Sequence, residues 1–178
     1  MRIICNFGIA YGLTAWALAR QLDVPLEEAE EIMENWKSNA EVAWEWIQEQ
    51  RMTPHREGYS VTPLGRYRYY GLVTEKNKRF KRNEAVNTPI QSTASDMTLL
   101  STIEVHKALR KSNLGTKIVN TVHDSILLQV PNNQIQATAE MTKEIMEKVP
   151  AETLETDIPF KVDVETGSHW SNVEEIEV

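Results

Sequence analysis

The sequence predicts an α+β protein, in which a helical first part is followed by a part that combines helices with an antiparallel sheet. Apolar side chains recur at helical spacing through residues 1–52, which favours helices there. β-Branched and aromatic residues flank a turn at 58–70, and two short strand-like runs meet at 123–124 within 117–130, which favours two hairpins. A long helical pattern separates the hairpins, and this arrangement is typical of α+β folds.

Length and composition restrict the class of protein. The 178 residues suit one domain or two small lobes, and the single cysteine, Cys5, excludes an internal disulfide. The net charge is -7, but residues 66–82 carry seven basic side chains and one acidic side chain. This basic stretch is either a track for the phosphates of a nucleic acid or an ordinary solvated loop.

The first expected element is a helix that contains Asn-Phe-Gly-Ile-Ala-Tyr-Gly at positions 6–12. Phe7 and Tyr11 stand four residues apart and share one face, while Gly8 and Gly12 share an adjacent face. A glycine within a helix costs about 1 kcal/mol relative to alanine. The two glycines therefore indicate close approach by another backbone or by a planar ligand such as a base pair, unless this is simply a tightly packed core helix.

The apolar run from Ile3 to Leu18 also has features of a secretory signal, including the small residues Ala17 and Ala19. Asn6 and the two glycines interrupt this run, which argues against a signal. The run is shorter than the roughly 20 residues that span a bilayer, and no later run is longer. We expect a cytoplasmic protein without a transmembrane segment.

The helical pattern continues from 13 to 22, and two more helices are expected after it. Pro25 is expected as the first residue of the next helix, and a third helix is expected to end near Met52. Their apolar stripes consist of Ala29, Ile32, Met33 and Trp36, and of Ala43, Trp46 and Ile47. We expect Trp36 and Trp46 to lie in the core.

A small hairpin and a long helix are expected next. Pro63-Leu64-Gly65 provides a turn within residues 58–70. The helix is expected from 82 to about 111, with Pro89 either in its first turn or at a kink. Gly115 is a plausible stop signal beyond it.

Two short strands are expected at 117–122 and 125–130, joined at His123-Asp124. Asn-Gly or Asp-Gly is favoured in such a two-residue connection, so His-Asp is an unfavourable choice that suggests a functional requirement. A helix at about 133–148 and a strand at 160–164 are expected to complete this part of the fold.

Three segments together resemble the C-terminal part of a family A DNA polymerase, the class of bacterial DNA polymerase I and many phage replicative enzymes. They are residues 6–12, residues 85–96 with the sequence AVNTPIQSTASD, and Val122-His123-Asp124, accompanied by Gly65-Arg66 and by Gly167-Ser168-His169-Trp170. The segments occur in the order and spacing of that family. The resemblance implies a helical fingers subdomain at 1–81 and the C-terminal part of a palm subdomain, with an antiparallel sheet, at 82–178.

The resemblance implies that the chain handles primer-template DNA and deoxynucleoside triphosphates. Asp124 resembles one of two carboxylates that bind two Mg²⁺ ions, and His123 resembles a residue that contacts the primer and supports the site. Phe7, Tyr11 and Asn6 are implied to bind the incoming nucleotide, since aromatic stacking suits any base. Without the resemblance, Asp124 and His123 are ordinary turn residues.

Asn87 and Gln91 stand four residues apart, so both amides face one way on a helix. By resemblance they reach the minor groove of the newest base pair, where acceptors are alike in all pairs and pairing can be checked without reading the sequence. Alternatively, Asn87 and Gln91 are ordinary polar residues on the protein surface. Arg82, Arg66 and Arg68 are candidate DNA-binding residues within the basic stretch.

The sequence also departs from the family at several positions. Ile3 stands where the family has a triphosphate-binding lysine, and Arg2 is one residue out of register, about 100° around the helix. The family's triphosphate-binding arginine and its other metal carboxylate precede this region. Asn83 stands where many members have arginine, and Ser125 replaces an acidic residue that often follows the palm aspartate.

We therefore expect a fragment of a template-directed DNA polymerase that needs an upstream polymerase fragment to supply the other catalytic carboxylate and that is inactive alone. A split gene and a truncation are equally compatible with this expectation. The alternative is a non-catalytic polymerase remnant that binds DNA or a partner. A metal-dependent hydrolase built on His123 and Asp124 is disfavoured, because no further ligands cluster near them in the sequence.

Overall fold

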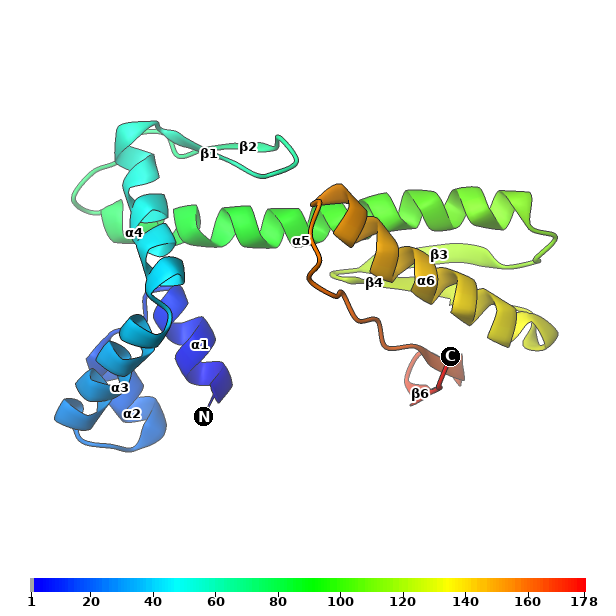
Figure 1. Ribbon diagram of the computed structural model, residues 1–178, viewed down its shortest axis with the longest axis horizontal. Coiled ribbons are helices and arrows are strands. Elements are labelled where there is room, and N and C mark those ends of the chain that lie inside the picture. Colours follow the sequence, from blue (N-terminus) through cyan, green and yellow to red (C-terminus); the bar gives the residue numbers. More distant parts are fainter. Residues whose placement is uncertain (1) are drawn as a thin grey trace. The chain divides into compact units, whose positions relative to one another are not determined.

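The computed structural model describes residues 2–178, with side chains described from Asn6 onward, and shows the expected α+β class (Figure 1). The chain forms two compact units, one up to Ser92 and one from Thr93 to Val178, and each is described by itself. The subdomain boundary at residues 81 and 82 stays a prediction. The expectations about the side chains of Arg2 and Ile3 lie outside the described residues. No helix among residues 2–178 has the length and apolar character that crossing a bilayer requires.

The first unit begins with four helices. They are α1 (Arg2–Ala10), α2 (Ala15–Leu22), α3 (Leu26–Asn39) and α4 (Glu41–Arg56). The predicted continuation of the first helix through residue 13 is wrong, because Gly12 has a φ of +92° and ends the helical path. Thr14 then caps α2, and its hydroxyl accepts a hydrogen bond of 3.3 Å from the backbone nitrogen of Ala17.

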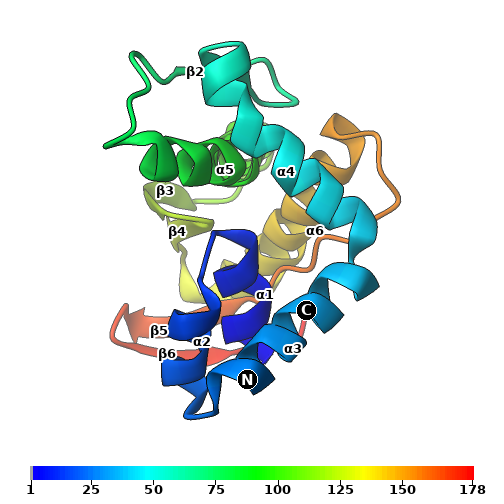
Figure 2. The same cartoon turned by 90° about the vertical axis from the view of Figure 1, so that its left-hand side faces the viewer.

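Helices α2 and α3 pack side by side around a small apolar core (Figure 2). Leu18, Ala19 and Ala29 are buried there, and the partly buried side chains around them are those of Leu13, Leu22, Val24, Ile32 and Met33. Trp36 and Trp46 are only half-buried, so their predicted place in the core is wrong. Helix α4 extends four residues beyond the predicted end at Met52 and contains Pro54.

The predicted hairpin at 58–70 is confirmed as β1 (Tyr59–Val61) and β2 (Tyr67–Tyr69). Gly65 lies in the turn with a φ of +79°, a conformation that glycine adopts without the clash of a Cβ. Buried Ser60 and Tyr70 secure the inner side of the hairpin, since the Tyr70 hydroxyl and the Ser60 Oγ lie 2.6 Å apart in a hydrogen bond.

The long helix α5 (Lys78–Lys111) belongs to both units, with the part up to Ser92 in the first. It begins four residues before the predicted start at Arg82. Pro89 therefore lies in the helix interior and not in the first turn. Ala85 and Val86 are fully buried and give the first part of α5 its packed face.

The second unit contains the predicted central hairpin and helix. Strands β3 (Lys117–Val122) and β4 (Ser125–Gln129) agree with the prediction to within one residue, and they pair antiparallel. The turn η1 (Asn132–Gln134) leads into α6 (Ile135–Thr153). Thr116 and Thr138 share a buried hydrogen bond of 3.0 Å, which ties the start of β3 to α6.

The predicted strand at 160–164 is wrong. That segment pairs with no described strand, and the C-terminal hairpin consists instead of β5 (Glu165–His169) and β6 (Asn172–Glu175). Among residues 2–178 the strands form three separate two-stranded sheets, so the second edge of β4 also has no strand beside it. A segment with strand-like composition becomes a strand only where a neighbour completes the hydrogen-bond ladder.

Candidate functional site

The end of helix α1 presents two aromatic rings on one side, as their spacing predicts. The ring centroids of Phe7 and Tyr11 lie 6.3 Å apart with an interplanar angle of 20°. Phe7 is 61% exposed, whereas Tyr11 is half-buried. Burial raises the pKa of the Tyr11 hydroxyl above its ordinary value. The pair offers a flat aromatic surface with the hydroxyl of a half-buried tyrosine at one side.

Asn6 has a structural partner. Its Oδ1 accepts a hydrogen bond of 2.9 Å from the indole nitrogen of Trp36, which links α1 to α3. This contact accounts for an asparagine at this position without a ligand. The role of Asn6 in nucleotide binding stays a prediction.

The two glycines of the opening motif lie against side chains of the chain itself. A Cβ on Gly8 would meet the Leu13 Cδ2 at 2.8 Å, and a Cβ on Gly12 would meet the Asn83 Oδ1 at 2.6 Å. Gly12 also has a positive φ, which disfavours any larger residue. Packing by neighbouring side chains therefore accounts for both glycines without a bound ligand.

We expect Gly12→Ala to destabilise the first unit by more than Gly58→Ala does. Both residues have positive φ, and such a conformation costs an alanine about 1–2 kcal/mol. Only at Gly12 does the new Cβ also meet a neighbour, because nothing lies within 4 Å of a Cβ at Gly58. Denaturant unfolding of both variants measures the difference in the free energy of unfolding.

The additional variant Asn83→Ala separates the two causes. If the contact with Asn83 matters, Gly12→Ala costs less when Asn83 has been shortened, and a double-mutant cycle gives a coupling free energy. Equal losses for Gly12→Ala and Gly58→Ala, with no coupling to Asn83, would contradict this description of the turn.

A small cavity of about 180 Å³ lies between Tyr11 and one face of α5. Its lining consists of Tyr11, Phe80, Asn83, Glu84 and Asn87. The structure thus brings together Tyr11 and Asn87, which the sequence predicted as separate parts of the site. Phe80 was not predicted, although the spacing of residues 80, 83, 84 and 87 is that of one helical face and is visible in the sequence.

Asn87 has an unsatisfied polar atom beside this cavity. Its Oδ1 is buried and has no hydrogen-bond partner among the described residues. Buried polar atoms without a partner are uncommon and costly, so an unpaired carbonyl oxygen favours a bound donor. The cavity has room for roughly six water molecules or for the edge of a larger ligand, and not for a whole nucleotide.

The candidate DNA-binding arginines differ in their surroundings. Arg68 forms an ion pair with Glu84 that links the hairpin to α5, and Lys81 forms a second ion pair with Glu84 at 2.9 Å within α5. Burial raises the pKa of Glu84, but the hydrogen bonds and charges of Lys81 and Arg68 outweigh it, and the net shift is downward. Arg66 is exposed, and Arg82 is half-buried with an Nε that has no hydrogen-bond partner among the described residues.

Gln91 is exposed on α5, one helical turn beyond Asn87. Its position on the same helix agrees with the expected common direction of the two amides. Phe7, Tyr11, Asn6, Asn87, Gln91 and the three arginines all belong to the first unit, while His123 and Asp124 belong to the second.

His123 and Asp124 form the tip of the β3–β4 hairpin, and both are exposed. His123 has a φ of +54°, which is uncommon for a residue with a side chain and agrees with the unfavourable turn chemistry noted in the sequence. The Ser125 hydroxyl donates a hydrogen bond of 2.8 Å to the Val122 carbonyl and closes the turn. No group of three or more metal-ligating His, Cys, Asp or Glu side chains occurs in the part of the chain that the structure describes.

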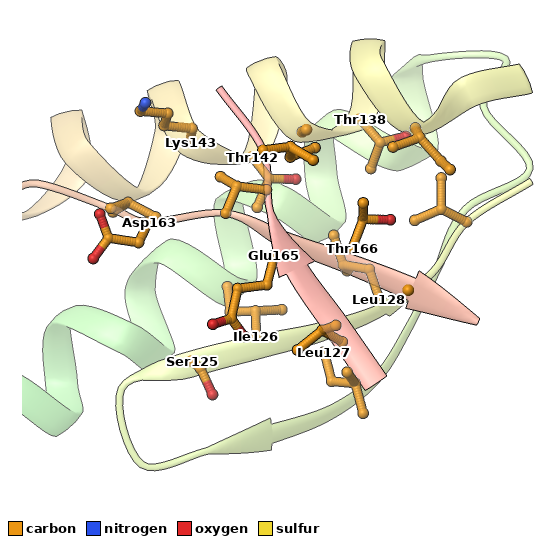
Figure 3. A pocket seen from close by; sticks show the side chains of 18 of the residues that line it. Ser125, Ile126, Leu127, Leu128, Thr138, Thr142, Lys143, Asp163, Glu165 and Thr166 are labelled. Carbon is orange, nitrogen blue, oxygen red and sulfur yellow. The ribbon is translucent and has the colours of Figure 1, made fainter. Parts of the chain in front are cut away.

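A cavity of about 1010 Å³ lies in the second unit beside this hairpin (Figure 3). Helix α6 lies on one side with Thr138 and Thr142, and β4 lies on the other with Ile126 and Leu128. The C-terminal segment 161–170 and Asp124 also line it. The Oγ1 of Thr142 is buried and has no hydrogen-bond partner among the described residues. The cavity therefore has both apolar and polar walls, with an unpaired polar atom and the free edge of β4 beside it.

Comparisons with known proteins find relatives for almost the whole chain. The family described as DNA polymerase family A matches residues 3–172. The DNA polymerase I of Geobacillus stearothermophilus is 32% identical over 168 residues, which are 93% of this chain and 19% of that protein. The thermostable DNA polymerase I of Thermus aquaticus is 30% identical over 173 residues, which are 96% of this chain and 20% of that protein.

A solved structure is similar as well. It is the POL domain of Pol1 from M. smegmatis in complex with DNA primer-template and dNTP, with a TM-score of 0.76 and 28% identity. The match covers 86% of this chain and 27% of that chain. The present chain thus spans about a fifth of the length of the curated relatives described here.

Proposed function

Because the chain belongs to DNA polymerase family A, we propose that it forms part of the active site of a template-directed DNA polymerase. In this proposal the complete enzyme adds deoxynucleotides to a primer 3′ end by two-metal phosphoryl transfer. The observation that carries the proposal is the match over residues 3–172, which contains every motif that the sequence suggested. DNA and nucleotide substrates would place such an enzyme in the cytoplasm.

Asp124 is proposed to hold Mg²⁺. Its carboxylate is exposed at the tip of a hairpin, and a hard oxygen donor of this kind fits Mg²⁺, which is commonly held by one or two carboxylates together with substrate phosphates and water. Bound there, Mg²⁺ ions would activate the primer 3′-hydroxyl and stabilise the leaving pyrophosphate. His123 is proposed to contact the primer end from the same turn.

Phe7 and Tyr11 are proposed to pack against the incoming nucleotide. Their near-parallel rings, with Phe7 mostly exposed, provide a flat surface that suits any base or sugar. Asn6 lies at the start of the same motif, and its hydrogen bond to Trp36 would fix the orientation of α1 for this purpose.

Asn87 and Gln91 are proposed to meet the minor groove of the newest base pair. Their position one helical turn apart on α5 supports this role, because the N–H groups of both amides can donate to the acceptors that every base pair presents in that groove. Arg66, Arg68 and Arg82 are proposed to contact DNA phosphates, since the stretch 66–82 is basic in a chain of net charge -7.

We propose that an upstream polymerase fragment contributes the second catalytic carboxylate. The cavity of the second unit is a suitable place for one of its strands, because the free edge of β4 and the unpaired Thr142 hydroxyl both lie beside it. A strand added to a free sheet edge gains main-chain hydrogen bonds. Since Asp124 also lines this cavity, a carboxylate on such a strand could approach it.

The second candidate is a non-catalytic remnant that binds DNA or a partner. It is favoured by one observation, namely that the described residues near Asp124 include no group of metal-ligating side chains. The two candidates differ in whether the chain supports synthesis once the missing groups are supplied.

Reconstitution distinguishes them. The chain alone is expected not to extend a primer, whereas extension is expected when it is mixed with the part of the G. stearothermophilus polymerase that precedes the similar segment. The assay measures Mg²⁺-dependent primer extension. A chimera in which residues 3–172 replace the similar segment of that polymerase provides a second arm that does not depend on association.

Two results would contradict the proposal. Robust synthesis by the isolated chain would show that no upstream fragment is needed. A chimera that folds and binds primer-template but makes no product would favour the non-catalytic remnant.

A further inference from the structure

The outer face of the β1–β2 hairpin carries three tyrosines that the proposed function does not use. The strand register places Tyr59 opposite Tyr69 and Tyr67 opposite Val61, so the three tyrosines project from the same face. Their ring centroids lie 5.4 Å apart for Tyr59 and Tyr67, 5.8 Å for Tyr59 and Tyr69, and 6.1 Å for Tyr67 and Tyr69. They form one aromatic surface, here named the tyrosine platform.

The tyrosine platform is open to solvent. Tyr67 is 56% exposed and Tyr69 is 73% exposed, with ring planes only 18° apart. The opposite face holds the hairpin in place through buried Ser60 and Tyr70 and through the ion pair of Arg68 with Glu84. The platform is thus not what anchors the hairpin, and an exposed aromatic cluster of this kind marks an interaction surface.

The basic sequence of the hairpin and of the segment that follows it favours a nucleic acid as the ligand of the platform. The basic stretch 66–82 begins within this hairpin and carries seven basic side chains against one acidic side chain. Of these basic side chains, Arg68 and Lys81 form ion pairs with Glu84, and Lys78 forms an ion pair with Glu75. Arg66 is exposed directly before Tyr67. Aromatic side chains for base stacking next to cations for phosphates are the combination that binds single strands without sequence preference.

Stacking on the tyrosine rings favours unpaired bases over duplex DNA. Inside a duplex each base face is covered by the neighbouring base pairs, so a tyrosine ring there can stack only on a base that has left the stack. We propose that the tyrosine platform binds unpaired bases of a single DNA strand without sequence preference. That this strand is the unpaired template rests on the proposed function.

The test measures the affinity of the full chain for a fluorescent single strand of roughly twelve thymidines by anisotropy. Base stacking on an aromatic residue contributes enough that losing it raises Kd by about five- to over a hundredfold per base. Tyr67→Leu combined with Tyr69→Leu is therefore expected to raise Kd for the single strand at least about tenfold. The affinity for a blunt duplex of the same length is expected to stay the same within about twofold.

Two control variants separate stacking from folding. Tyr70→Phe removes the buried hydrogen bond to Ser60 on the opposite face and is expected to leave the affinity for the single strand unchanged. Tyr69→Phe keeps the ring on the platform and is expected to retain binding. Photocrosslinking of a strand that contains 5-iodouracil, followed by mass spectrometry, is expected to identify Tyr67 or Tyr69.

Three outcomes would overturn the inference. They are no binding of the single strand by the wild-type chain, equal affinities of the wild-type and the double variant, and self-association through these tyrosines in the absence of DNA. Failure of the proposed function is distinguishable, because Asp124→Asn is expected to abolish synthesis without changing the affinity for the single strand. If the assembly still synthesises DNA but the platform does not bind single strands, the inference about the platform is refuted and the proposed function is not.

Discussion

Asp124→Asn is expected to lower the rate of single-nucleotide incorporation by about a thousandfold or more in the reconstituted assembly. Asparagine keeps the size of the side chain and suits a turn, but it lacks the charge that holds Mg²⁺ at the primer end. The affinity for primer-template is expected to change little, since the loss falls on the transition state. Rapid-quench kinetics at saturating nucleotide measures the rate, and anisotropy measures the affinity.

Asp157→Asn is the matched control, because Asp157 is an exposed aspartate in the same unit that does not line the cavity. It is expected to leave both quantities unchanged. If Asp124 only shapes the turn, Asp124→Asn lowers stability slightly and the rate hardly at all. Incorporation by Asp124→Asn near the wild-type rate would refute the metal assignment.

Phe7→Tyr is expected to improve the use of dideoxynucleotides by roughly ten- to over a hundredfold. A phenyl ring next to the sugar offers no hydrogen bond, so a dideoxynucleotide loses the contact that the 3′-hydroxyl of a normal nucleotide can make to its own phosphates. The tyrosine hydroxyl can supply a hydrogen bond to a charged phosphate, with a contribution of about 1.5–3 kcal/mol. Natural nucleotides are expected to respond little.

The measurement is the ratio of incorporation efficiencies for deoxy and dideoxy substrates in the reconstituted assembly. Phe160→Tyr, the same substitution in the second unit, is the control and is expected to leave the ratio unchanged. An unchanged ratio for Phe7→Tyr would place Phe7 away from the sugar and would leave α1 as a packed helix.

The elements that the sequence predicted well are those whose determinants are local. The β3–β4 hairpin was predicted to within one residue, because a run of strand-forming residues lies on each side of its turn. The break after α1 was missed, since a helical pattern does not reveal that Gly12 has a positive φ. The strand at 160–164 was wrong, because pairing depends on a neighbour that composition does not show.

In the candidate site, too, features set by local sequence could be predicted and features set by tertiary packing could not. The common face of Phe7 and Tyr11 follows from their spacing, and the structure bears it out in the ring contact. The hydrogen bond between Asn6 and Trp36, 30 residues apart, and the ion pair between Arg68 and Glu84, 16 residues apart, depend on tertiary packing. Such partners cannot be predicted from a local sequence pattern. The common helical face of Phe80 and Asn87, by contrast, follows from their spacing in the sequence.

Template-directed synthesis is tested most directly by the incorporation of each of the four nucleotides opposite each of the four template bases in the reconstituted assembly. Preference for the complementary nucleotide in all four cases is the expected result, with all incorporation reduced about a thousandfold by Asp124→Asn. It follows if Phe7 and Tyr11 hold the nucleotide while Asn87 and Gln91 contact the new pair. Incorporation that ignores the template base, or no incorporation by a folded assembly that binds primer-template, would contradict it.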